Sequence, residues 1–220
     1  PALPAALTAA GEPAPYVLVG HSLGGPISLL YTKAHGDDVA GLVMVDASHP
    51  DQFDRFEEIG IETESTALKA LEIASALSWT GVGRVIAAQM DAMPNQRADA
   101  AAAQRALAPR SMKGAVAEMK ILDDIFDDAE DARELGDRPL VVLTAMKPLT
   151  AGERKMLGVT DEQARRQKEI WLAMHEEEAR WSTAGRQVVL PDAGHYVQFD
   201  RPDAVIAAVA EVVGAVRNRP

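Results

Sequence analysis

Three sequence features follow one another near the start of the chain: a short apolar run, the sequence G-H-S-L-G at residues 20–24, and a helical pattern. This order restricts the fold more than any other feature. Residues 16–19 include two valines and follow two prolines, which predicts a short strand. Pro26 fits the first turn of a helix, where its missing N–H does no harm. Strand, sharp turn and helix in this order are typical of a nucleophile elbow, which lifts a serine hydroxyl out of a sheet.

Ser22 is the predicted nucleophile of this elbow. A serine hydroxyl is a weak nucleophile at neutral pH, so it needs a base within hydrogen-bond reach and a group that orients the base. Gly20 and Gly24 leave room for the tight turn. The N–H of Leu23, at the start of the helix, is the expected oxyanion donor. His21 lies inside the turn, where we expect it to shape the substrate-binding pocket rather than to take the proton.

His195 is the predicted base. Residues 187–190 form an apolar run that predicts a strand, and residues 191–194 are typical of the loop that leaves it. Asp200 is the expected N-cap of a last helix that begins at about residue 202. A histidine in a loop at the end of a core strand is therefore expected to reach the serine.

The other histidines are weaker candidates for the base. His35 is near a helix end, and His175 lies on a long polar helix, where we expect it to be solvated. His49 follows directly after a strand end, so it is a candidate for lining the substrate-binding pocket together with His21.

The acid of the site has to lie between the serine and the histidine in the chain. The strand predicted at residues 140–144 is followed by no carboxylate before Glu153. The strand predicted at residues 41–45 ends directly in Asp46, at the edge of the sheet where catalytic groups collect in open α/β folds. Asp46 is therefore the predicted acid, and Asp51 and Glu153 are the alternatives.

The chain is expected to be an α/β protein with an inserted helical segment. Residues 1–50 and 137–220 alternate strands and helices, which predicts a mostly parallel sheet flanked by helices. Residues 51–136 contain no convincing strand and show helical spacing, so we expect a helical lid there. The acidic run at residues 123–131 is expected to be a solvated helix face. Large apolar residues of the insertion are expected mainly to pack its helices together: Phe53, Phe56, Trp79, Met90, Met93 and Met112.

Composition excludes several classes of function. The chain has no cysteine, so disulfides and thiolate chemistry are absent. A net charge of −11 argues against nucleic acid or an anionic membrane as a partner. No apolar run is long enough to span a bilayer, no signal peptide is seen, and a cytoplasmic location is favoured. Neither a metal nor a cofactor is expected, and the expected partner is a small acyl substrate. The oligomeric state is not indicated.

Three segments together resemble the α/β-hydrolase superfamily: residues 19–25 around the elbow, residues 41–52 around Asp46, and residues 194–198 around His195. The chain is most similar to bacterial esterase-like members described as hydrolases or acyltransferases. The resemblance implies a Ser22–His195 dyad completed by an acid, with ester or amide cleavage and no cofactor. Acyl transfer or perhydrolysis by the same residues remains an alternative.

The chain departs from this family in two respects. The strand after the insertion lacks the acid that many relatives carry there, which favours Asp46. Relatives also have a long segment before the elbow that supplies the first strands and a second oxyanion donor. We therefore expect this chain to be the C-terminal portion of a hydrolase that lacks its N-terminal strands. A non-catalytic chain with the hydrolase fold is the alternative from a different class.

Overall fold

The computed structural model describes residues 2–61 and 95–219. The chain divides into two compact units, one formed by residues 1–61 and 126–220 and the other by residues 62–125. The first unit thus includes residues 51–61 and 126–136, which the sequence assigned to the insertion. A role of the second unit as a lid stays a prediction.

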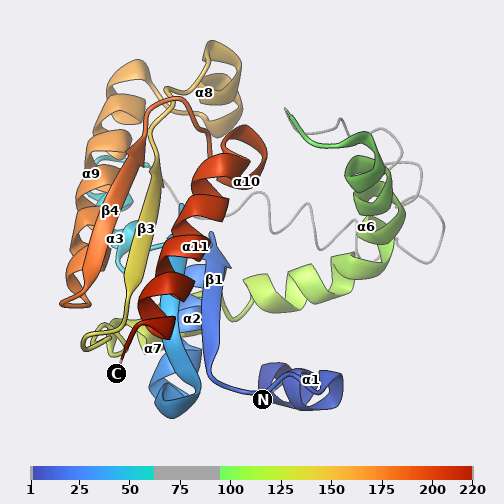
Figure 1. Ribbon diagram of the computed structural model, residues 1–220. Coiled ribbons are helices and arrows are strands. Elements are labelled where there is room, and N and C mark those ends of the chain that lie inside the picture. The colour runs from blue at the N-terminus through green and yellow to red at the C-terminus, as the bar shows by residue number, and fades with distance from the viewer. Residues whose placement is uncertain (1, 62–94, 220) are drawn as a thin grey trace. The chain divides into compact units, whose positions relative to one another are not determined.

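A four-stranded parallel sheet forms the centre of the first unit, as predicted (Figure 1). Its order is β1 (Tyr16–His21), β2 (Val39–Val45), β3 (Leu140–Ala145) and β4 (Gly185–Leu190). Parallel neighbours require a crossover connection between them, and helices fill this role here. All four strands therefore end at the same edge of the sheet, which is where the candidate catalytic residues follow.

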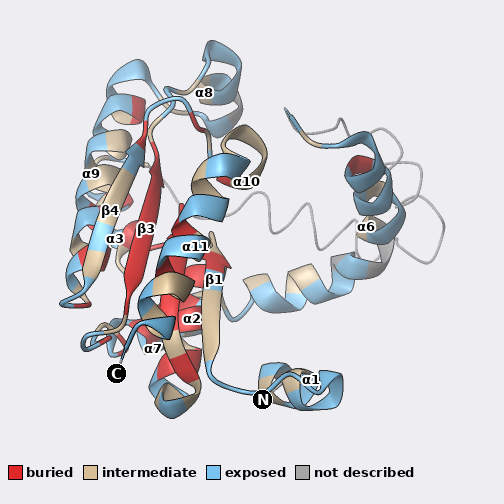
Figure 2. Ribbon diagram, in the orientation of Figure 1, coloured by how far each residue is buried: buried red, intermediate tan, exposed pale blue. Residues whose placement is uncertain are grey.

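Helices cover both faces of the sheet because the strands alternate their apolar side chains between two cores. On one face, α2 (Gly24–Ala34) packs on β1 and β2, around Leu42 and Met44, and α9 (Asp161–Arg180) packs on β3 and β4. On the other face, α11 (Pro202–Arg217) packs on Val43 and Val45. Strand β3 is buried along its whole length (Figure 2), and β2 is buried at every residue except Ala40, as expected for strands covered on two sides.

The shorter elements of this unit are α1 (Ala2–Ala10), η1 (Gly36–Asp38), α3 (Gln52–Glu57), α8 (Ala151–Leu157) and α10 (Val197–Asp200), together with the part of α7 (Leu122–Glu130) from residue 126 onward. Helix α9 begins with a capping box, in which Thr160 and Gln163 satisfy each other's backbone N–H groups. The expectation for Asp200 was wrong. Arg201 is the N-cap of α11, and the Asp200 carboxylate instead accepts the Gly194 N–H at 2.8 Å.

Residues 98–119 of the second unit form α6 (Ala98–Met119), and no strand occurs among the described residues of this unit. Trp79, Met90 and Met93 lie outside the described residues, as does the Met112 side chain. In the first unit, Phe53 packs edge-on against Phe126 and Phe56 stacks on Trp171, so these two phenylalanines do pack helices together.

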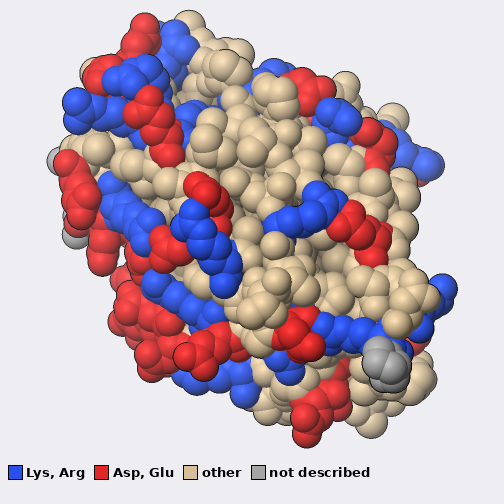
Figure 3. All heavy atoms as spheres, turned by 60° about the vertical axis from the view of Figure 1, so that its left-hand side comes forward, with Lys and Arg blue, Asp and Glu red and all other residues tan. Residues whose placement is uncertain are grey.

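The acidic residues of the 123–131 run are exposed, while Phe126 and Ala129 of α7 are buried, as expected for a solvated helix face. Along α9, acidic and basic side chains form pairs one turn apart, such as Arg166 with Glu162 at 2.8 Å. Figure 3 shows both charges side by side on the face of the molecule that it turns forward. Among the described helices, none has the length and apolar character needed to cross a membrane.

Gly20 allows β1 to turn sharply into α2. A Cβ atom at Gly20 would lie 2.4 Å from the carbonyl oxygen of Gly24, whereas a Cβ at Gly24 would meet nothing within 4 Å. We expect Gly20→Ala to lower the free energy of unfolding by about 2–3 kcal/mol, because backbone must shift to accept the methyl group. The matched control Gly24→Ala should stay within about 1 kcal/mol of wild type. Urea denaturation measures both, and equal values for the two variants would contradict the prediction.

Candidate active site

Ser22 sits in a strained turn at the carboxyl end of β1. Its φ of 54° lies in the left-handed region, which is uncommon for a residue other than glycine. The Ser22 N–H donates to the Val45 carbonyl at 3.3 Å, and the Ser22 carbonyl accepts the N–H groups of Gly25 and Ser48, each at 2.9 Å. These bonds tie the turn to the end of β2. The strained conformation therefore has the support that it needs to persist.

The start of α2 lies close to the loop that follows β2. A Cβ atom at Gly25 would come within 2.5 Å of the Ala47 Cβ, so only glycine permits this approach. Leu23 is the N-cap of α2, and its N–H donates to none of the residues that the structure describes. This N–H is thus available at the positive end of the helix, as an oxyanion donor would need to be.

The structure brings His195 and Asp46 together. His195 Nδ1 lies 2.8 Å from Asp46 Oδ2, although the two residues are far apart in the chain. Because a carboxylate only accepts hydrogen bonds, Nδ1 carries the proton, which leaves Nε2 free to act as a base. The His195 ring is 43% exposed and the Asp46 side chain 4%. The imidazole of His195 is therefore open to solvent while its carboxylate partner is buried, which is the arrangement that a general base would need.

Asp46 receives two further hydrogen bonds. Its Oδ1 accepts the Ala145 N–H at 2.9 Å and the Trp171 indole N–H at 2.8 Å. Burial alone would raise the pKa of Asp46, but the hydrogen bonds from His195 and Trp171 and the nearby His175 outweigh burial and lower it. Asp46 is therefore a carboxylate at neutral pH.

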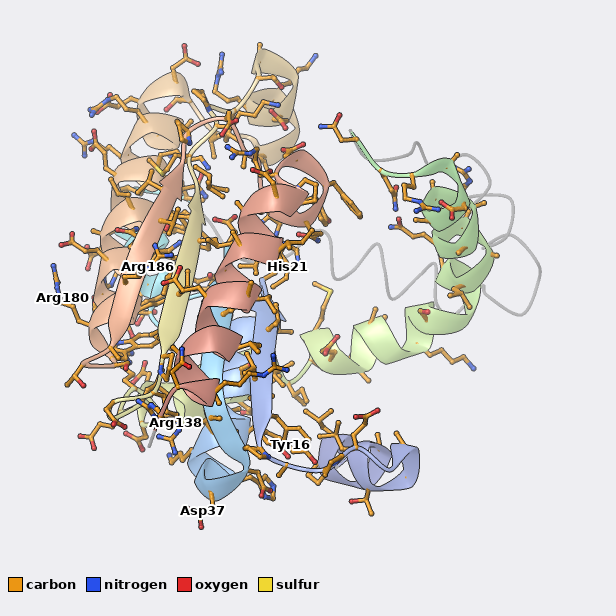
Figure 4. The ribbon with its side chains drawn as sticks, in the orientation of Figure 1. Tyr16, His21, Asp37, Arg138, Arg180 and Arg186 are labelled. Atoms are coloured by element: carbon orange, nitrogen blue, oxygen red, sulfur yellow. The ribbon has the colours of Figure 1, made fainter. Side chains whose placement is uncertain are left out.

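His21 packs against the loop that carries the predicted base. Its ring centroid is 4.7 Å from that of His195 and 5.5 Å from that of Tyr196, and its Nε2 donates to the His195 carbonyl at 2.9 Å. Figure 4 labels His21 at the end of β1. Burial is the main reason why the pKa of His21 is lowered, so the ring is neutral at pH 7. Contact of His21 with a substrate stays a prediction.

His175 corrects an expectation, because it is fully buried rather than solvated. Its Nε2 donates to the Ala47 carbonyl at 2.9 Å, and its Nδ1 lies 2.9 Å from the Thr144 hydroxyl. Because Nε2 carries the proton that it donates to Ala47, Nδ1 of the neutral ring is unprotonated and accepts the hydrogen bond from the Thr144 hydroxyl. The sequence of α9 is polar overall, so it did not indicate that His175 lies on a face that contacts Thr144 of β3 and Ala47 after β2.

His49 and Asp51 belong to a separate polar cluster. His49 is fully buried against the Trp181 ring, with centroids 5.3 Å apart, and its Nδ1 accepts the Asp51 N–H at 3.1 Å. Burial lowers the pKa of His49 to about 3, so it is neutral. The Asp51 carboxylate pairs with Arg55 at 2.7 Å and also with Arg133. Lining of a substrate pocket by His49 stays a prediction.

The same cluster has the donor set of a metal site but not the charge balance of one. Ligand atoms of His49, Asp51 and Glu177 all lie within 4.8 Å of one another. Arg55 bridges the two carboxylates, with distances of 2.7 Å to Asp51 and 2.9 Å to Glu177, and Arg133 is the second cation. Two guanidinium groups already neutralise the two carboxylates and would repel a divalent cation.

Glu153, the other alternative acid, caps a helix. Its carboxylate accepts the Thr150 N–H at 2.6 Å, and its own N–H donates to the Thr150 hydroxyl at 3.2 Å, which completes the capping box of α8. The Asp51 carboxylate thus binds arginines and the Glu153 carboxylate caps α8, whereas Asp46 is paired with His195.

Glu178 on α9 is a buried carboxyl group with an unpartnered oxygen among the described residues. Burial, followed by the negative charges of Asp46 and Glu177, raises its pKa well above the ordinary 4.5. The folded protein thus holds a proton that the unfolded chain releases above pH 4.5. Stability is consequently lost as the pH rises from that value through the raised pKa.

We expect Glu178→Gln to remove the loss of stability at high pH, because the glutamine amide is neutral at every pH. The gain in melting temperature over wild type should be larger at about pH 8 than at about pH 5. Glu176→Gln, an exposed neighbour on the same helix, is the control and should show no such dependence. A gain for Glu178→Gln that does not change with pH would refute the assignment.

Comparison with known proteins agrees with this fold. The sequence profile of the alpha/beta hydrolase family matches residues 2–208. The chain belongs to this family, which places it among hydrolytic enzymes. No curated protein sequence matches the chain.

Solved structures with a similar fold include three hydrolases. A probable hydrolytic enzyme from Pseudomonas aeruginosa PAO1 is 19% identical with a TM-score of 0.56, over 96% of this chain and 67% of that one. A thermophilic esterase from Thermogutta terrifontis is 20% identical with a TM-score of 0.52, over 97% and 70%. A putative lipase from Acinetobacter baumannii AYE is 20% identical with a TM-score of 0.55, over 98% and 66%. The chain thus spans about two thirds of the length of these proteins.

Proposed function

We propose that this chain is the catalytic part of a serine hydrolase that cleaves carboxylic esters or related small acyl substrates. The observation that carries the proposal is the 2.8 Å contact of His195 Nδ1 with Asp46, beside a serine held at a φ of 54°. Ser22 follows directly on His21, whose ring packs against His195, and the Ser22 backbone bonds to residues on either side of Asp46, which supports a common site for the three residues. The family membership supports the same class of reaction.

The reaction divides into acylation and deacylation. The Ser22 oxygen bonds to the substrate carbonyl carbon while its proton passes to Nε2 of His195. The tetrahedral oxyanion is stabilised by the Leu23 N–H. When the bond to the leaving alcohol breaks, His195 returns the proton to that alcohol, and an acyl group remains on Ser22. Water then repeats these steps and releases the acid, while Asp46 stabilises the imidazolium that forms in each half.

Hydrolysis of p-nitrophenyl acetate and butyrate, together with labelling by a fluorophosphonate, tests the proposal. We expect release of p-nitrophenol and attachment of one phosphonyl group, which peptide mass spectrometry should locate on Ser22. Ser28 is an internal control, because its hydroxyl donates to the Gly24 carbonyl at 2.6 Å and should stay unlabelled. Absence of both turnover and labelling would overturn the proposal and favour a non-catalytic chain. Faster release when an alcohol is added would favour acyl transfer by the same residues.

A further inference from the structure

The acid of the proposed triad is held by a helix that contributes none of the three triad residues. We propose that Trp171 of α9 is a positioning residue, whose indole N–H fixes the Asp46 carboxylate so that Oδ2 faces His195. This inference rests on the proposed function of Ser22, His195 and Asp46. It adds to that proposal a residue that acts through Asp46 and touches no reacting atom.

The hydrogen bonds of Asp46 are divided between its two oxygens. Oδ1 accepts two N–H groups, from Ala145 at 2.9 Å and from Trp171 at 2.8 Å, and Oδ2 pairs with His195 Nδ1 at 2.8 Å. The final torsion of an aspartate is broad, so a carboxylate with a single partner can rotate. Two donors on Oδ1 oppose this rotation and keep Oδ2 directed at the imidazole. Removing the indole N–H leaves Oδ1 with the backbone donor alone.

Trp171 can act in this way because two other rings hold its own ring in place. Phe56 of α3 stacks on it with centroids 6.1 Å apart and an angle of 27°, and the His175 ring contacts it with centroids 4.6 Å apart. A side chain that is locked by packing holds a hydrogen-bond donor in one direction, which is what a supporting residue has to do. The direction of the N–H is therefore set by the packing of α3 and α9.

His175 extends the same support to the backbone of the loop. It lies one turn after Trp171 on α9, and its Nε2–H donates to the carbonyl of Ala47, the residue that follows Asp46. Asp46 itself has a φ of 43°, in the left-handed region, so its backbone needs outside support to keep this conformation. One face of α9 thus fixes the side chain of residue 46 and the carbonyl of residue 47.

Comparison of Trp171→Phe with Trp181→Phe separates positioning from packing. Trp181 is the C-cap of the same helix and packs on His49, and its indole donates no hydrogen bond within the part of the chain that the structure describes. Both variants lose one pyrrole ring and keep an aromatic side chain. We expect Trp171→Phe to lower kcat for p-nitrophenyl butyrate on the order of tenfold with little change in KM. Trp181→Phe should stay within about twofold of wild type.

Proton NMR gives a readout that does not depend on turnover. The His195 Nδ1 proton, shared with Asp46, should give a far-downfield resonance, which Asp46→Asn should abolish and thereby assign. We expect this resonance to weaken and broaden in Trp171→Phe, because Asp46 can rotate and the proton exchanges with water. Trp181→Phe should keep it. The inference is overturned if the resonance and kcat of Trp171→Phe equal those of Trp181→Phe.

A second substitution covers the case in which Trp171→Phe does not fold. Incorporation of 3-benzothienylalanine at position 171 replaces the indole N–H by sulfur and keeps the shape of the ring, so any loss reports the hydrogen bond alone. If wild type shows the resonance but neither turnover nor fluorophosphonate labelling, the proposed hydrolase function has failed. The resonance of the analogue then still tests the hydrogen bond between Trp171 and Asp46. If wild type is active and the analogue leaves both readouts unchanged, only the role of Trp171 has failed.

Discussion

Ser22→Ala is expected to lower kcat for p-nitrophenyl butyrate by about 10⁴-fold or more and to abolish fluorophosphonate labelling. The residual rate would come from binding and from the oxyanion donor, which do not need the hydroxyl. Alanine keeps the Cβ atom of serine, so the left-handed turn at a φ of 54° is no more strained than in wild type. Steady-state kinetics and a urea denaturation curve measure the two effects separately, and the free energy of unfolding should change little.

Ser28→Ala is the matched control for this variant. Ser28 lies on α2, and its hydroxyl bonds only to the Gly24 carbonyl in the part of the chain that is described. Ser28→Ala removes the same Oγ atom as Ser22→Ala, but six positions further along the chain, so the activity of this variant should stay near that of wild type. A rate for Ser22→Ala similar to that for Ser28→Ala would show that the nucleophile lies elsewhere.

Asp46→Asn is expected to lower kcat by about 10⁴-fold while the protein stays folded. Asparagine tolerates the left-handed backbone, which here has a φ of 43°. Its amide oxygen can still accept the N–H groups of Ala145 and Trp171, so the amide nitrogen has to face His195. An N–H there cannot accept the Nδ1 proton. His195 is driven to the tautomer with the proton on Nε2, where it cannot act as a base.

Glu153→Gln is the control for the choice of acid. Glu153 was an alternative acid in the sequence and caps α8 in the structure. Glutamine fills the same position in the capping box of α9, so Glu153→Gln should keep the cap and leave both helix stability and kcat near wild type. Near-normal turnover by Asp46→Asn, with a loss in Glu153→Gln, would reverse the assignment. Circular dichroism of both variants checks that their folds are intact.

Local sequence patterns predicted the elements around the site because they depend on neighbouring residues. The valines of β1 and Pro26 in the first turn of α2 each act within a few residues. The position of Asp46 at a strand end was predictable in the same way, since parallel strands bring their carboxyl ends to one edge.

The residues that hold Asp46 in place could not be predicted, because their contacts depend on which face each helix packs against the sheet. Trp171 and His175 are spaced by one turn, which indicates a shared face but not what that face contacts. The burial of His175 and the pairing of Asp51 with Arg133 depend on chain segments that are distant in sequence. The same holds for Asp200, whose carboxylate binds the Gly194 N–H instead of capping α11.

The sequence by itself determined the elbow at Ser22, the parallel α/β class and the candidates His195 and Asp46, because strand, turn and helix signals are local. Only the tertiary structure decided which carboxylate meets the imidazole, since that depends on packing between distant elements. Packing of α9 on β3 and β4 brings the indole N–H of Trp171 to Asp46. A buried carboxylate needs such donors, and only a folded chain can supply them from three separate segments.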